Sequence, residues 1–225
     1  MRHVYINAAD SWEEADEHFE QFLAVVPERR LQLAEWVAAT GGPVLDRSVE
    51  SLGPVNEWFI ETVLDRPAPP DVEYRPAWMP PRNPDWRPNP TNPRAAPGWL
   101  YLLWEQVAVY VGDVMIEQVP GSRWVCWRAK HKGVIDNGMP VIDFGVPDRP
   151  FNAITCANGG VLRSWTHQGT GNDMDVRPAP SKIRGYFVAE LARREAHFAE
   201  HPARWKVAPT GPGARRSQRT PATSP

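Results

Sequence analysis

Cysteine is scarce in this chain, with two residues, Cys126 and Cys156, among 225. They stand far apart, whereas thiols that share a zinc ion or form a redox pair are usually separated by a few residues. The N-terminal residues also lack the apolar segment of a secretory signal. We therefore expect a cytoplasmic protein whose two thiols are reduced and buried.

Long uninterrupted apolar runs are absent as well. The most apolar stretch, residues 99–119, contains Glu105, Gln106, Asp113 and Glu117. Charged side chains are costly inside a bilayer-spanning segment. This stretch therefore predicts a helix within a soluble protein and no membrane contact.

The sequence contains none of the short motifs that would identify a reaction. It has no G-x-x-x-x-G-K-[ST] loop, no G-x-G-x-x-G and no G-x-S-x-G. The sequence therefore gives no support for a phosphate-binding loop or for the nucleophile motif of a serine hydrolase, and we expect no cofactor. One alternative function remains, a small hydrolase-type enzyme in which His131, Asp136, Asp143 and His167 meet in a cleft, although nothing in their spacing requires this.

Two histidines of the last expected helix raise the question of a metal site. His197 and His201 are four residues apart and would share one face of that helix. The H-E-x-x-H pattern of zinc peptidases is absent, and no third ligand stands nearby. Histidines near a helix C-terminus are also favoured by the helix dipole, so we expect no metal.

Charge is distributed unevenly along the chain. Residues 1–66 hold 13 acidic and 5 basic residues, whereas residues 181–225 hold 3 acidic and 9 basic residues. These can be two solvated surfaces, surfaces that attract one another, or surfaces that attract a charged partner. The basic tail is compatible with a weak nucleic-acid contact without sequence preference.

Proline and tryptophan are abundant, with 25 and 11 residues. Eleven of the prolines fall within residues 67–97, a segment that we call the strap. Each proline removes an amide donor and fixes φ, so helix and sheet are both excluded. The strap predicts a polyproline II rod or an irregular segment that is laid along the body or projects from it.

The strap also carries the candidate partner-binding residues. They are Trp78, Arg82, Trp86 and Arg87. Tryptophan and arginine are the residue types that most often anchor protein interfaces, whereas a buried indole that pins the strap to the body would contribute about 1.5–3 kcal/mol. Both interpretations hold if one indole faces inward and the other outward.

Three helices are expected within residues 10–65. Ser11-x-x-Glu14 is a capping box that begins the first helix. Pro27 suits the first turn of a second helix, and a third begins near Ser51. The apolar face of the second would comprise Leu31, Ala34, Val37 and Ala38, and that of the third Leu52, Val55, Phe59 and Val63.

A different pattern follows the strap. Residues 98–119 predict a helix. Short runs in which successive residues would face opposite sides of a strand then predict an antiparallel meander. Its strands would lie at 124–127, 141–144, 153–156 and, less clearly, 161–165. A last helix opens at Ser181. The fold class is therefore α+β, with a helical unit (1–66), the strap (67–97), an α+β core with a C-terminal helix (98–206) and a disordered tail (207–225).

Three segments carry a resemblance. "ESLGPVNEWF", "LWEQVAVYVGDV" and "GSRWVCW", in that order, are similar to uncharacterised bacterial families, chiefly actinobacterial, over about residues 28–165. The resemblance implies a helical segment before a helix-and-hairpin core, and it implies no catalytic residues. The absence of catalytic motifs, the segregation of charge and the clustered Trp and Arg residues of the strap, rather than the resemblance, predict the function. We expect a non-enzymatic cytoplasmic protein that binds another protein, as an inhibitor, an immunity factor or an adaptor.

Overall fold

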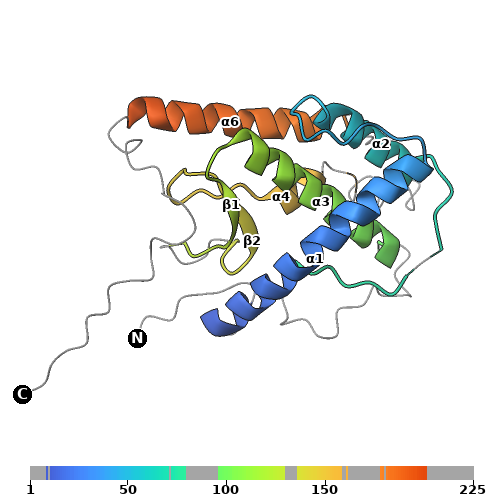
Figure 1. Ribbon diagram of the computed structural model, residues 1–225, viewed down its shortest axis with the longest axis horizontal. Coiled ribbons are helices and arrows are strands. Elements are labelled where there is room, and N and C mark those ends of the chain that lie inside the picture. Colours follow the sequence, from blue (N-terminus) through green and yellow to red (C-terminus); the bar gives the residue numbers. More distant parts are fainter. Residues whose placement is uncertain are drawn as a thin grey trace, which may run out of the picture.

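The chain has an α+β fold in the computed structural model (Figure 1). The structure describes residues 9, 11–70, 72–79, 96–129, 136–158, 161, 178–179 and 181–201. Within these residues there are five helices and one two-stranded antiparallel sheet. The elements are α1 (Trp12–Ala39), α2 (Leu52–Leu64), α3 (Gly98–Gln118), β1 (Arg123–Cys126), β2 (Pro140–Asp143), α4 (Ala153–Asn158) and α6 (Lys182–Glu200).

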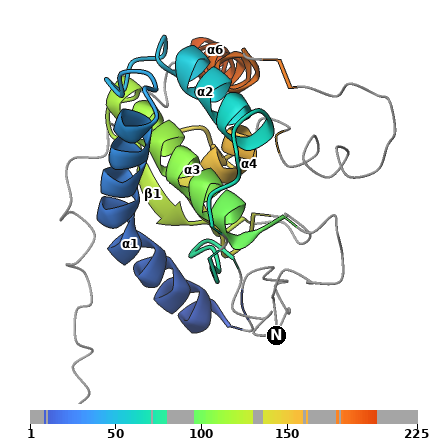
Figure 2. The same ribbon diagram turned by 90° about the vertical axis from the view of Figure 1, so that its right-hand side faces the viewer.

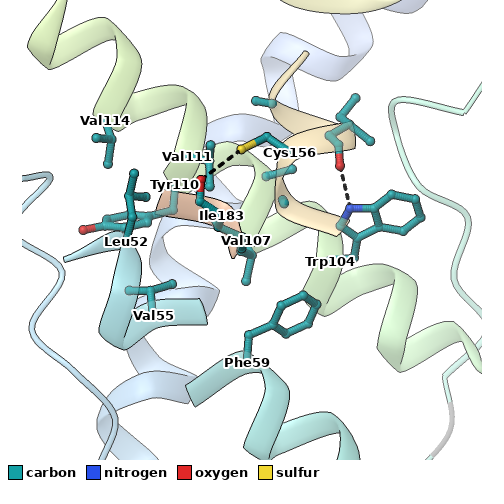
Figure 3. Packing of buried hydrophobic residues seen from close by; sticks show 14 of the residues in the cluster. Leu52, Val55, Phe59, Trp104, Val107, Tyr110, Val111, Val114, Cys156 and Ile183 are labelled. Atoms are coloured by element: carbon teal, nitrogen blue, oxygen red, sulfur yellow. Dashed lines mark hydrogen bonds between the residues drawn. The ribbon is translucent and has the colours of Figure 1, made fainter. Parts of the chain in front are cut away.

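Helix α3 forms the centre of the molecule and is packed against α1, α2, α4 and β2. Its apolar residues are buried around most of its circumference, as expected for a helix that is covered on all sides. Figure 3 shows its side chains facing those of α2, and the indole of Trp104 reaching a backbone carbonyl of α4. That carbonyl belongs to Ile154 and accepts the indole N–H at 2.8 Å. Among the described helices, none is long and apolar enough to cross a membrane.

Glycine lets two segments approach α3 closely. A Cβ at Gly112 would lie 2.3 Å from the indole of Trp124, so the missing side chain is what allows β1 to pack on this helix. A Cβ at Gly98 would lie 1.9 Å from the carbonyl oxygen of Val72, so the strap passes directly against the start of α3.

Residues 12–39 form one helix, and the expected break at Pro27 is wrong. Ser11 caps α1 as predicted, with its Oγ accepting the amide of Glu14 at 3.1 Å. Proline inside a helix costs about 3 kcal/mol. The buried stripe of α1 runs without a change of register on both sides of Pro27, because α3 contacts it before Pro27, at Val26, and after it, at Arg29, and that packing offsets the loss. The stripe comprises Ala15, His18, Phe22, Val26, Arg29, Leu33 and Val37.

The face assigned to the second half of this helix is also wrong in part. Val37 is buried as expected, but Leu31, Ala34 and Ala38 are exposed, and Leu31 keeps 60% of its surface accessible. Arg29 occupies the buried stripe in their place. The face of α1 predicted from hydrophobicity alone is therefore not the face that is buried.

The sheet is shorter than expected. The strands at 124–127 and 141–144 are confirmed as β1 and β2, paired antiparallel with Arg123 opposite Asp143. The expected strand at 153–156 is instead helix α4. Asn152 caps it, because its Oδ1 accepts the amide of Thr155 at 2.8 Å. Of the fourth expected strand, only Val161 lies in the part of the chain that the structure describes.

Helix α6 closes the fold against α2 and α4 (Figure 1). It begins after Ser181 as predicted, and it contacts the body through few side chains. Phe187 is fully buried and meets the ring of Phe151 edge-on, with ring centroids 5.6 Å apart. Glu190 is 2% exposed and pairs with Arg193 and Arg149.

Candidate protein-binding surface

A buried carboxylate on α3 joins α1 to the strap. Glu105 has no exposed surface. Its Oε1 accepts Arg29 Nε at 2.8 Å and the hydroxyl of Tyr74 at 2.5 Å, and its Oε2 accepts the backbone amide of Ala77 at 2.5 Å. One carboxylate therefore receives donors from α1 and from two positions of the strap, and it fixes where the strap crosses the body.

The ring of Tyr74 completes this attachment. The guanidinium of Arg29 lies 5.3 Å from the centre of the ring, a distance at which the aromatic face attracts a cation. Burial raises the pKa of Tyr74 well above its ordinary value, and the charge of Glu105 adds to the shift. The hydroxyl therefore remains a hydrogen-bond donor to Glu105 at any physiological pH.

A second arginine of α1 is also held by α3. Arg30 donates to both oxygens of Asp113, from Nε and Nη2, each at 2.7 Å. Asp113 is 5% exposed. Of the five basic residues within residues 1–66, two are therefore paired with acids of α3. Arg29 is buried and therefore adds little to the surface charge of this part of the chain, whereas the side chain of Arg30 stays 42% exposed.

These pairings leave the opposite side of α1 acidic. We call this stripe the outer face; it contains Glu13, Glu17, Glu20, Ala24, Glu28, Leu31, Glu35 and Ala38, all exposed. Their spacing of three and four residues places them in one row along a helix of 28 residues, about 42 Å long at 1.5 Å per residue. Figure 2 shows α1 along one edge of the molecule, with α3 on its inner side.

Trp78 lies against the body. It is half-buried, and its ring meets that of Trp104 edge-on, with centroids 4.9 Å apart. It also packs on the cluster formed by Phe22, Val26 and Val109. This arrangement supports the pinning interpretation for Trp78. The other candidate partner-binding residues, Arg82, Trp86 and Arg87, lie outside the described residues, and their role stays a prediction.

The alternative hydrolase site can be followed for two of its four residues. Asp136 accepts the side-chain amide of Asn152 at 2.6 Å, and Asp143 lies 3.8 Å from the guanidinium of Arg123. Both carboxylates therefore have partners on neighbouring segments. His131 and His167 lie outside the described residues, so the hydrolase hypothesis stays a prediction.

The two histidines at the end of α6 are stacked on one another. The ring centroids of His197 and His201 are 4.7 Å apart and the rings are nearly parallel, at 24°. The lone pairs of parallel rings do not converge on one point, which is unfavourable for a shared metal ion. Within the described residues, no group of three or more His, Cys, Asp or Glu side chains is placed to hold one.

Both cysteines are free thiols, as expected. Cys156 is buried as expected, whereas Cys126 is only half-buried, so the expectation of a buried thiol is wrong for Cys126. Burial raises the pKa of Cys126 to about 11, and the neighbouring Asp16 adds to the shift. Burial also raises the pKa of Cys156. Because the thiolate is the reactive form, neither residue is activated as a nucleophile at neutral pH.

Sequence reasoning missed the residues that organise this surface. In the sequence, Glu105 is recognisable only as a charge that interrupts an apolar run, and no pattern singles out Arg29. The available signal was the presence of two acids, Glu105 and Asp113, within the largely apolar residues 99–116, because buried acids require basic partners. This signal indicates that the two acids have basic partners, but it does not identify Arg29 and Arg30 as those partners.

The chain matches no family model, no curated protein and no solved structure. Its function is therefore inferred from its own residues.

Proposed function

We propose that this protein is a non-enzymatic protein-binding module, acting as an inhibitor, an immunity factor or an adaptor, and that it binds its partner through the outer face of α1. The observation that carries the proposal is Leu31. It is 60% exposed on a folded helix, with the exposed carboxylates of Glu28 and Glu35 one turn before and after it.

The composition of this face is that of a small interface. Interfaces typically have an apolar centre surrounded by polar side chains, and here Ala24, Leu31 and Ala38 lie among glutamates. The face is presented by a helix whose other side is packed on α3. Little conformational entropy is therefore lost when a partner binds.

The charge of the outer face favours a basic partner. Arg29 is held on the buried side of α1 by Glu105, although its Nη1 also lies 3.3 Å from Glu28 Oε1, and Arg30 is paired with Asp113 while its side chain stays 42% exposed. The outer face still presents four further exposed glutamates, Glu13, Glu17, Glu20 and Glu35. Complementary charge increases the rate of association and disfavours acidic competitors. The partner that fits best is therefore a protein with a basic groove or a basic helix lined by apolar side chains.

The strap supplies a second contact in this proposal. Trp78 holds the strap to the body through Trp104, and Arg82, Trp86 and Arg87 would extend the binding surface beyond that attachment. Tryptophan is suited to this role because its large ring contributes contact area with few rotatable bonds. Arginine is suited to it because its side chain offers several hydrogen-bond donors.

Replacing Leu31 by aspartate is expected to weaken partner binding at least tenfold, about 1.4 kcal/mol or more. The change places an unpaired charge at the apolar centre of the interface, and the position is exposed, so folding is preserved. The measurement is quantitative mass spectrometry of proteins captured from host extracts by the wild-type protein and by the variant.

Val188→Asp is the matched control, because Val188 is also an exposed apolar residue, 43% accessible, but lies on α6. We expect this variant to capture the partner as the wild type does. The proposal is wrong if Leu31→Asp and wild type capture the same proteins in equal amounts, or if the wild type captures none above background.

A further inference from the structure

A buried histidine lies where the strap crosses α1. His18 belongs to the buried stripe of α1 and is 7% exposed. Its Nδ1 has no hydrogen-bond partner among the described residues. On the strap side, it faces the backbone carbonyls of Ala77 and Met79. One turn further along α1, Phe22 packs in the same cluster as Ala77 and Trp78, so this part of the strap covers the helix at His18.

Two charged groups act on this imidazole within the described part of the chain. Glu14, one turn earlier on α1, favours the protonated form, and Arg75 of the strap opposes it. The carbonyls of Met79 and Ala77 also favour the protonated form. Burial outweighs these contributions, because the charged ring would lose its hydration beneath the strap, and it lowers the pKa of His18 below its ordinary 6.5.

We propose that His18 makes the attachment of strap residues 74–79 sensitive to pH, so that the neutral imidazole keeps the strap docked on α1 and protonation releases it. The inference goes beyond the proposed function, because it concerns the contact between the strap and α1 and requires no partner. Its consequence is that acidification frees the segment that leads into Arg82, Trp86 and Arg87.

The direction follows from proton linkage. A histidine whose pKa is lower when the strap is docked binds its proton more readily when the strap is released. Docking is therefore strongest above the ordinary pKa of 6.5 and weakens as the pH falls from there toward the lowered value. Release takes up one proton, which limits the weakening to about tenfold per pH unit.

Hydrogen exchange of the backbone amides of residues 72–79 in the full chain tests this inference. The amide of Ala77 is the most informative, because it is bonded to Glu105 in the docked strap. After correction for the intrinsic exchange rate, its protection in the wild type is expected to be constant above pH 7 and to fall between pH 6.5 and pH 5, by up to about tenfold per unit.

Two variants separate His18 from other titrating groups. In His18→Gln, the side chain is polar but cannot be protonated, and the protection of Ala77 is expected to be flat over this range. His201→Gln, at the exposed end of α6, is expected to keep the wild-type slope. Wild-type protection that does not change between pH 7 and pH 5, or an equal slope in His18→Gln, would overturn the inference.

A titration of the wild-type protein covers the case in which His18→Gln does not fold. In a sample with labelled histidine, the nuclear magnetic resonance of His18 should titrate below pH 6.5, and the amide signals of residues 72–79 should shift with the same midpoint. A His18 midpoint at or above pH 6.5 would also overturn it. Capture of a partner is not measured in either experiment, so this inference and the proposed function can fail separately.

Discussion

Replacing Glu105 by alanine is expected to lower the free energy of unfolding by about 3–5 kcal/mol, the usual result of breaking a buried ion pair from one side. The substitution leaves the guanidinium of Arg29 buried without its partner. It also removes the acceptor of the Tyr74 hydroxyl and of the Ala77 amide. Denaturant unfolding followed by circular dichroism measures the loss.

Glu117→Ala is the matched control, because Glu117 lies on the same helix and is exposed. We expect it to change stability by less than about 0.5 kcal/mol. In a double-mutant cycle, Arg29→Met should remove much of the effect of Glu105→Ala, because no buried charge then remains unpaired. A loss below about 1 kcal/mol for Glu105→Ala would show that this carboxylate does not hold α1 and the strap together.

The second large effect is expected at Phe187. Phe187→Ala should destabilise the protein by about 3–5 kcal/mol, the range found for buried phenylalanine. Helix α6 buries only Ile183, Phe187 and Glu190 among its residues, so neighbouring side chains cannot compensate for the cavity. Thermal and denaturant unfolding measure the change, and hydrogen exchange shows whether α6 is released before the rest of the fold.

The neighbouring residue provides the control for this substitution. Val188 follows Phe187 in the same helix but is 43% exposed. Val188→Ala is expected to change stability by less than about 0.5 kcal/mol, since it removes little buried surface and alanine favours the helix. Equal effects of the two substitutions would contradict the orientation of α6.

Local signals predicted most of the helices and both strands. The capping residue Ser11 and the apolar spacing of residues 52–63 act over a few residues, and the structure keeps both of them. The two errors in the type and extent of elements arose where other contacts outweighed a local preference. Pro27 remains inside α1 because packing on α3 continues past it. Residues 153–158 form a helix because Asn152 caps them, although their composition suits a strand.

The candidate surface was less predictable for a related reason. Arg29 is buried because Glu105, 76 residues away, receives it, and no local pattern contains that pairing. Hydrophobicity alone therefore placed Leu31 on the inner face of the helix. The acidic excess of residues 1–66 could be read directly from the sequence, but the side of α1 that carries it could not.

The most direct test of the proposed binding face is crosslinking from position 31. A photoreactive amino acid placed at Leu31 in the full-length protein, expressed in its native host, should give one discrete adduct with a protein that bears a basic surface. The same amino acid at Val188, exposed on α6, should not give that adduct. If position 31 gives no adduct, or if both positions give the same ones, the outer face of α1 is not the binding surface.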